Sequence, residues 1–399
     1  MPRFINIIKD RMDSSYNFRR EDLIWKLVLL SLLVLLFFLI CFYLYQSDLS
    51  DLPHPYIMGD WLINYQDGGF KRRGLSGSFF FLLQDLTDIP LKYLVFFTQI
   101  SFYLILFYNL ASFLRTKILT WGYVLLLFSP FTLLFLANNG GAVGRKEVIL
   151  LAIFSLAAHW VNKGSYNFNK KLFIMLNLFI ASFFHELSLF FTPYFFLLES
   201  NLSFSNFIEN LKKNFGYILT TLIPTLAILI FGVRINEGQS ISILHERGIE
   251  LQGGIFDPRW SQISHNQLIS EIVLNPAGYF EYLISLTYMF CFLIYYLRLS
   301  KKMDLLFSII VCFTFSIPMF IVALDWGRWL FIHFTLILII LSIKLENKES
   351  NSGNQTLSFR QISSLTYLFL IGNLVLGVGH YANGLKFSLL FGQIIKYLF

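Results

Sequence analysis

The chain has 399 residues, of which 56% are hydrophobic, 18% aromatic and 14% charged, and its mean hydropathy is +0.63. Ordinary globular proteins carry roughly 25% charged residues, so the composition excludes a conventional soluble protein and predicts an all-α polytopic membrane protein. The net charge of +7 does not indicate nucleic-acid binding, because the cations cluster at the ends of apolar runs, where they set membrane topology.

Residues 1–26 are polar and basic and precede the first apolar run. Their six Lys and Arg residues predict a cytoplasmic N-terminal segment by the positive-inside rule. We expect the rest of the chain, residues 27–399, to form a single integral membrane domain. Its first span, at about 27–45, delivers the residues that follow to the outer face.

Further apolar runs approach the ~20 residues that cross ~30 Å of hydrocarbon as a helix, and we expect about 10–12 membrane helices. The clearest predicted spans are residues 90–114, 119–137, 148–161, 215–233, 278–297, 304–324, 329–343 and 362–379. A run at 78–83 is too short to cross and suits an interfacial or re-entrant helix, and a last short run begins at residue 385. The polar segments are expected as outer-face loops at 47–77, 138–147, 234–277 and 325–328 and as a cytoplasmic loop at 344–360.

The apolar run 172–198 decides the topology, because it holds the polar pair His185-Glu186 at its centre and Pro193 beyond it. A single span here would place the later basic turns outside, against the positive-inside rule. Two helices broken at His185-Glu186 would keep every basic turn cytoplasmic. The sequence therefore favours a helical hairpin with its turn at the outer face.

The stretch 59–77 combines several glycines with two carboxylates and three consecutive cations. These are Asp60, Asp67, Lys71, Arg72 and Arg73. Glycine lets a backbone approach a ligand closely, and Lys and Arg donate hydrogen bonds to phosphate oxygens. Ionisable groups near a bilayer are costly, which favours a working site over the alternative of a solvated connecting loop.

On this topology the unusual polar groups of the chain all reach the outer face. The candidate catalytic groups are Asp60, Glu147, His185 and Glu186. The candidate groups for binding diphosphate or sugar are Lys71, Arg72, Arg73, Arg145, Lys146, Asp325, Arg328, Tyr65 and Trp61. Cations would neutralise a diphosphate, aromatic rings would stack on sugars, and a carboxylate or histidine would act as base.

Each candidate also has a purely structural interpretation. Glu147 opens a helix after a glycine-rich turn, where free N–H groups favour an anion, and it is equally suited to capping that helix. His185-Glu186 could form a satisfied polar kink. Asp325 and Arg328 are spaced for a local ion pair, which anchors a helix end as readily as it binds a substrate.

No motif for a metal or a nucleotide is present. The sequence has no Walker phosphate loop, no His-Glu-x-x-His zinc motif and no Gly-x-Ser-x-Gly elbow. Its three cysteines lie within apolar runs without metal-ligand spacing. We therefore expect neither a metal nor a cofactor. The polar residues of the 234–277 loop are expected to be mostly solvated; they include His245, Glu246, Arg247, Asp257 and His265.

Three short motifs, together with the many-helix plan, carry a family resemblance. They are Phe184-His185-Glu186-Leu187-Ser188, Asp325-Trp326-Gly327-Arg328-Trp329 and the basic run at 69–77. The chain resembles the polytopic polysaccharide polymerases of bacterial O-antigen and exopolysaccharide assembly, the EpsG-like Wzy proteins. The resemblance implies a GT-C-like bundle in the bacterial inner membrane that joins glycan repeat units on undecaprenyl diphosphate at the periplasmic face, without a metal. A first outer loop bearing Asp60 is also similar to the general GT-C plan, in which an acidic residue there acts as base.

The predicted function is therefore glycosyl transfer that polymerises a polyprenyl-diphosphate-linked oligosaccharide, as in lipopolysaccharide or capsule synthesis. Membrane lipid surrounds the protein, and a chain-length regulator and a flippase are its expected partners. One alternative is a single-sugar GT-C glycosyltransferase that uses a polyprenyl-phosphate sugar. A flippase or transporter for a lipid-linked glycan is disfavoured because most predicted spans lack charge at their centres, and His185 leaves an acyltransferase open.

Overall fold

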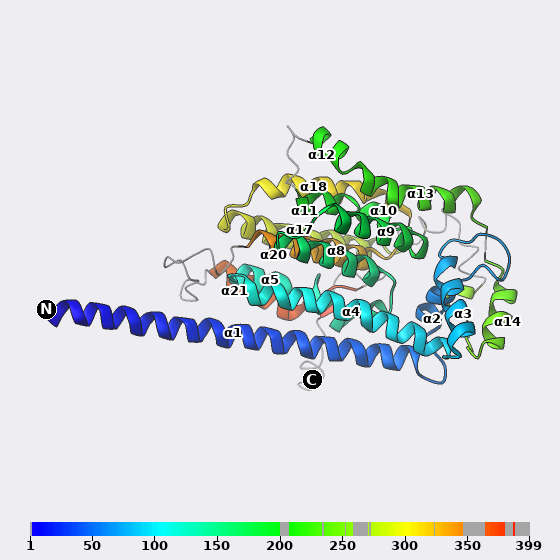
Figure 1. Cartoon of the computed structure of the whole chain (residues 1–399), viewed down its shortest axis with the longest axis horizontal. Coiled ribbons are helices and arrows are strands. Elements are labelled where there is room, and N and C mark those ends of the chain that lie inside the picture. The colour runs from blue at the N-terminus through cyan, green and yellow to red at the C-terminus, as the bar shows by residue number, and fades with distance from the viewer. Residues whose placement is uncertain are drawn as a thin grey trace.

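The computed structural model describes residues 2–199, 207–233, 235–251, 253–257, 270, 273–322, 324–345, 364–379 and 386–387. These residues form a helical bundle with very little strand structure (Figure 1). Four of the described helices are long and apolar enough to cross a membrane. They are α1 (Pro2–Asp48, apolar over Leu23–Asp48), α4 (Leu91–Thr116), α17 (Pro276–Leu299) and α20 (Trp326–Lys344). The predicted all-α fold is confirmed for this part of the chain, and the total of 10–12 spans stays a prediction.

The other elements are shorter. In chain order the helices are α2 (Pro55–Leu62), α3 (Gly74–Thr87), α5 (Trp121–Leu127), α6 (Leu133–Asn138), α7 (Gly140–Val143), α8 (Glu147–Asn162), α9 (Phe168–Phe184), α10 (Ser188–Phe191), α11 (Pro193–Glu199), α12 (Phe207–Lys213), α13 (Phe215–Phe231), α14 (Glu237–Glu246), the 3₁₀ helix η1 (Gly254–Phe256), α18 (Asp304–Phe315), α19 (Ile317–Val322) and α21 (Ser364–Val375). Strands β1 (Leu376–Gly377) and β2 (Lys386–Phe387) pair antiparallel.

Helix α20 forms the core of the bundle. Its side chains from Gly327 to Ser342 are all buried, and it packs against α4, α5, α8, α11 and α17. A helix that is apolar on every side belongs in such a position. By contrast, α1, α4 and α13 each leave large apolar side chains exposed, among them Leu35, Phe97 and Leu229. Exposed apolar surface of this extent suits contact with the hydrocarbon of a membrane.

The hairpin predicted within 172–198 is confirmed. A short turn at His185-Glu186 separates α9 from α10. Lys171, near the start of α9, forms an ion pair of 2.6 Å with Glu199 at the end of α11. The chain must reverse direction between these two residues, so the polar pair lies at the tip of a hairpin.

The two ends of the bundle differ in chemistry. Lys117 donates hydrogen bonds to the carbonyls of Ile343 and Leu345 at 3.1 and 3.0 Å, and Lys302 donates to the carbonyl of Lys344. We call this end, where α4, α17 and α20 finish, the lysine end. The opposite end, where α2, α3 and α14 lie together, is the loop end (Figure 1).

Two predicted spans are interrupted by polar turns. The run 119–137 divides into α5 and α6, because Pro130 has no N–H and the Thr132 hydroxyl donates to carbonyls at the end of α5 instead. The run 304–324 divides into α18 and α19 at Ser316, whose hydroxyl also donates to a carbonyl of the helix before it. Neither break follows from the apolar run length that predicted the spans.

The expected outer-face loops contain helices of their own. Segment 47–77 includes α2 and the start of α3, and the described part of 234–277 includes α14 and η1. The short run 78–83 lies inside α3, whose 14 residues are too few to cross a bilayer. The loop expected at 344–360 and the run from 385 lie almost wholly outside the described residues.

Gly77 allows α3 to cross close to the end of α2. A Cβ at this position would lie 2.3 Å from the carbonyl oxygen of Ile63 and 2.5 Å from that of Leu62. Gly77→Ala must push the two segments apart, and we expect it to lower the free energy of unfolding by about 1–3 kcal/mol, as overpacking does. The control is Gly238→Ala in α14, because no atom lies within 4 Å of a Cβ there. Equal melting temperatures for the two variants would contradict the close crossing.

Candidate functional site

The glycine-rich stretch 59–77 is packed against the bundle and is not a solvated loop. Asp67 pairs with Lys71 and accepts a hydrogen bond from the Ser240 hydroxyl of α14, and all three residues are buried. The N–H of Val233, just after α13, donates to a carbonyl of the stretch at 2.7 Å. These contacts hold the stretch between α13 and α14. Lys71, predicted as a diphosphate ligand, is 1% exposed and is paired with Asp67.

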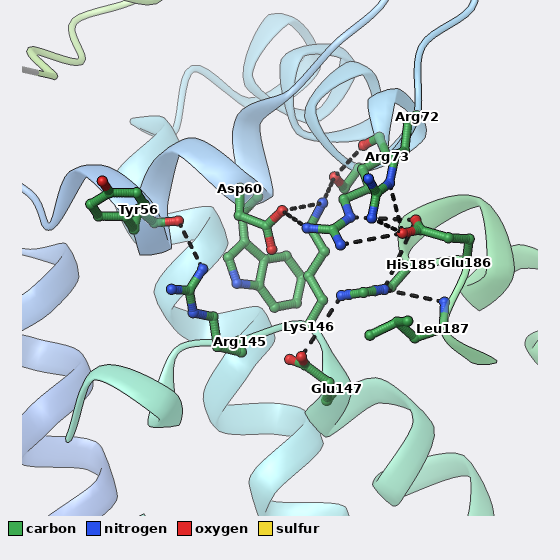
Figure 2. Close-up of polar contacts among 12 residues, drawn as sticks. Tyr56, Asp60, Arg72, Arg73, Arg145, Lys146, Glu147, His185, Glu186 and Leu187 are labelled. Atoms are coloured by element: carbon green, nitrogen blue, oxygen red, sulfur yellow. Dashed lines mark hydrogen bonds and ion pairs between the residues drawn. The ribbon is translucent and has the colours of Figure 1, made fainter. Parts of the chain in front are cut away.

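Arg72 and Arg73 point toward the tip of the α9–α10 hairpin, where Glu186 lies (Figure 2). The Arg73 guanidinium donates to Asp60 at 2.9 Å and lies 3.3 Å from Glu186. Arg72 donates to the same Glu186 carboxylate at 2.7 Å, and Lys146 Nζ lies 3.9 Å from Asp60. We call these five side chains the arginine network. Its members come from α2, the start of α3, the start of α8 and the hairpin tip.

A second network joins the starts of α20 and α8. Arg328 pairs with Asp325, as the spacing of the two residues predicts, and also donates to Glu147 at 2.9 Å. The local ion pair is therefore confirmed, and the contact with Glu147 is one that spacing alone does not reveal. We call these three residues the Glu147 network. Trp329, which follows Arg328 in α20, is buried.

His185 lies between Glu186 of the arginine network and Glu147 of the second network (Figure 2). Its Nε2 is 3.7 Å from Glu147, and its Nδ1 is 4.0 Å from Glu186. Nδ1 also accepts a hydrogen bond from the N–H of Leu187 at 3.3 Å. A neutral imidazole has one donor and one acceptor, so this bond assigns the ring proton to Nε2, on the side of Glu147.

Arg145 differs from the other cations of the site. Its Nη1 donates to the backbone carbonyl of Tyr56 at 3.4 Å (Figure 2), while Asp60 and Glu147 act on it electrostatically. A guanidinium whose hydrogen bond goes to a carbonyl keeps most of its donors for an incoming anion.

The two aromatic candidates do not offer open stacking surfaces. Trp61 is fully buried, and its indole N–H donates to the carbonyl of Gly144 at 2.7 Å. Its ring lies 6.0 Å from Lys146 Nζ, which places it as a support for that cation. Tyr65 already stacks on Phe70, with ring centroids 5.5 Å apart. Because the Trp61 ring is buried, it has no free face for a sugar in this structure, and its predicted stacking role stays a prediction.

The structure thus brings together ten of the candidates: Asp60, Arg72, Arg73, Arg145, Lys146, Glu147, His185, Glu186, Asp325 and Arg328. Ser76 also belongs to the site, although it is not among the predicted site residues. Its hydroxyl accepts a hydrogen bond from Lys146 at 2.8 Å. Its place within the glycine-rich stretch was the only signal in the sequence.

In the 234–277 segment, His245 is exposed, Arg247 pairs with Asp85 at 2.8 Å, and His265 lies outside the described residues.

Burial opposes charge within the site. It lowers the pKa of Lys146 to about 8, although Asp60 acts to raise it. Burial, followed by the Arg73 charge, lowers the pKa of His185 to about 4. Burial alone would raise the pKa of Asp60, but Lys146 and Arg73 outweigh it and hold that pKa below its usual range. At neutral pH the site therefore contains an ionised Asp60 and a neutral His185.

The contribution of His185 to stability should be lost as the pH falls from about 6.5 to about 4. In this window His185 takes up a proton in the unfolded chain but not in the folded one, so stability is lost as the pH falls. Asp60 affects the stability only below this pH window, because its pKa in the folded protein lies under the ordinary value of 3.8. His185→Gln should flatten the dependence of melting temperature on pH across the same window. A variant whose slope equals that of the wild type would contradict the burial of a neutral imidazole.

Across the residues that the structure describes, no group of three His, Cys, Asp or Glu side chains could hold a metal ion. Comparison of the chain with protein-family models, with curated proteins and with solved structures gives no match. The two networks and His185 between them are therefore the features from which a function can be proposed.

Proposed function

We propose that the chain is a polytopic protein of the bacterial inner membrane, with its lysine end in the cytoplasm and its loop end at the outer face. The support is the gathering of Lys117, Lys171 and Lys302 at one end, because the positive-inside rule assigns such residues to the cytoplasm. Helix α1 begins beyond that end and reaches the loop end at Asp48 (Figure 1), which gives a cytoplasmic N-terminus.

We propose that the loop end carries out glycosyl transfer from a polyprenyl-diphosphate donor. The observation that carries the proposal is the meeting of five cations and four carboxylates around His185. With His185 neutral, the cations exceed the carboxylates by one. The Arg72 side chain is 60% exposed, so its guanidinium can turn from Glu186 to the oxygens of a diphosphate.

The geometry suggests a division of roles. Arg72, Arg73 and Arg145 would neutralise the diphosphate as it leaves. Cations hold the pKa of both Asp60 and Glu147 below the ordinary values of these groups. Asp60 is paired directly with Arg73 and serves to orient it. Glu147 keeps Oε2 without a hydrogen-bond partner in the described part of the chain, so it is better placed to accept the proton of the attacking hydroxyl.

The particular reaction we propose is polymerisation of glycan repeat units on undecaprenyl diphosphate, for O-antigen, capsule or exopolysaccharide, alongside a flippase and a chain-length regulator. A single-sugar transferase that uses a polyprenyl-phosphate sugar would need the same kind of site. A flippase would instead place charged groups along the helices, whereas both networks lie at one end. Deleting the gene and separating the surface glycan on a gel distinguishes these cases. Loss of the ladder with one repeat unit retained is expected for a polymerase, and loss of the whole glycan indicates the single-sugar transferase.

Arg145→Ala is the sharpest test of the site, because removing the Arg145 side chain breaks no direct ion pair with a carboxylate. We expect the variant to remain in the membrane with an unchanged melting temperature and to lose transfer by about 100-fold or more, as loss of one charge-stabilising donor does. Arg115→Ala is the matched control, since Arg115 is exposed in the last turn of α4 at the lysine end. Wild-type polymer in the Arg145 variant would contradict the proposed function.

A further inference from the structure

A cavity beside Glu147 has the size of a single hydroxyl group. It is lined by Tyr103, Ala142, Arg145, Glu147 and Arg328, together with apolar side chains of α8 and α20. Its volume is about 10 Å³, roughly the space that one water molecule needs. Neither a phosphate group nor a sugar ring fits such a volume.

Three polar atoms of the lining residues have no hydrogen-bond partner within the described part of the chain. They are Glu147 Oε2, Arg328 Nε and Arg145 Nε. Glu147 is 7% exposed and Arg328 is 8% exposed, so bulk water cannot satisfy these atoms. Buried polar groups in folded proteins are nearly always hydrogen-bonded, which indicates that a small polar ligand belongs here.

The other oxygen of Glu147 is already engaged. Oε1 accepts a hydrogen bond from Arg328 Nη1 at 2.9 Å and lies 3.7 Å from His185 Nε2. These contacts orient the carboxylate and leave Oε2 as an open acceptor.

The chemistry of the cavity selects a neutral group that both donates and accepts. Two guanidinium N–H groups offer donors, and Glu147 Oε2 offers an acceptor. A cation would be repelled by Arg145 and Arg328, and the cavity is too small for a phosphate anion that these arginines would otherwise attract. An O–H group can accept a hydrogen bond from a guanidinium and donate one to a carboxylate, so it matches both the donors and the acceptor of this lining.

We propose that this cavity binds the attacking hydroxyl, either from an acceptor sugar whose ring stays outside or from water. The inference rests on the proposed glycosyl transfer. Glu147 Oε2 takes the hydroxyl proton as the oxygen bonds to the anomeric carbon of the donor. The bond from that carbon to the diphosphate oxygen breaks, and its electron pair leaves with the diphosphate. With water as nucleophile, the same step hydrolyses the donor.

The test uses the full-length protein in lipid nanodiscs. Binding is measured with farnesyl diphosphate, and transfer is measured with the lipid-linked glycan that accumulates in the deletion strain. Glu147→Gln replaces the acceptor oxygen and should slow transfer by about 100-fold or more while diphosphate binding is unchanged. Reactions run in ¹⁸O-labelled water separate the two sources of the hydroxyl, since only hydrolysis places the label in the product.

Variants of Ala142 test the cavity without changing any charge. Ala142→Val reduces the space of the cavity, and Ala142→Ser places a fixed hydroxyl at its wall and should fold even if the larger side chain does not. Both should lose transfer and keep diphosphate binding. Ala181→Val is the control, because Ala181 lines a neighbouring cavity on the His185 side of Glu147. Full transfer by Glu147→Gln or by both Ala142 variants would overturn the proposal.

A structural measurement separates the proposal of glycosyl transfer from the proposal of a hydroxyl-binding cavity. If the wild type neither binds farnesyl diphosphate nor transfers glycan, glycosyl transfer is wrong. High-resolution cryo-electron microscopy then decides on the cavity alone. An ordered oxygen beside Glu147 Oε2 that is absent from Ala142→Val supports the hydroxyl site, and a wild-type cavity without density refutes it.

Discussion

Replacing Arg73 with alanine should abolish glycan transfer and also destabilise the protein, because this guanidinium holds the buried carboxylate of Asp60 and the partly buried carboxylate of Glu186. It lies 2.9 Å from Asp60 and 3.3 Å from Glu186, and its side chain is 16% exposed. Breaking a buried ion pair from one side costs roughly 3–5 kcal/mol, since one charge loses its partner. Thermal unfolding in detergent measures the stability, and a glycan gel measures the transfer.

A double variant separates the two effects of Arg73. Arg73→Ala combined with Asp60→Asn removes both charges of the closest pair, so much of the lost stability should return. Transfer should not return, because the cation that faces the diphosphate is still missing. Restored transfer in the double variant would show that Arg73 serves only to hold Asp60.

Replacing Arg328 with methionine should be the most destabilising change in the Glu147 network. Arg328 connects the start of α20 to the start of α8 through Glu147, and their side chains are 9% and 7% exposed. The substitution leaves the Glu147 carboxylate buried without its closest cation, so we expect a loss of roughly 3–5 kcal/mol. Melting temperature and the yield of monodisperse protein after extraction report this loss.

Asp325→Asn is the matched control for that substitution. The Asp325 side chain is 32% exposed, so water solvates much of its charge, and removing its pair with Arg328 should cost at most about 1 kcal/mol. Equal damage from the two variants would mean that the local pair, and not the contact with Glu147, holds α20 in place.

The helical class and the hairpin follow from local properties of the chain. The length of an apolar run limits what it can cross, and a histidine and a carboxylate in the middle of such a run cannot remain in hydrocarbon without a partner. His185-Glu186 therefore predicts a turn, and the structure has one. Local polar breaks inside longer runs, such as the one at Thr132, were missed because run length does not detect them.

The direction of each helix also brings the polar segments together. When membrane spans alternate in direction, every second connection lies at the same end of the bundle. The topology therefore predicts that five polar segments meet there: residues 60, 72–73, 145–147, 185–186 and 325–328. The described contacts join these segments at the loop end. The sequence by itself thus determined the helical nature of the fold and the end of the bundle at which its charges gather.

Only the tertiary structure decided which of these residues form one site. Lys71 and Arg72 are neighbours in sequence, yet the contacts from α13 and α14 bury Lys71 against Asp67 while Arg72 reaches Glu186. Trp61 is likewise buried beside Lys146. In both cases the partner of a side chain depends on the lateral packing of the helices. Lateral packing involves residues far apart in the chain, and no local pattern encodes it.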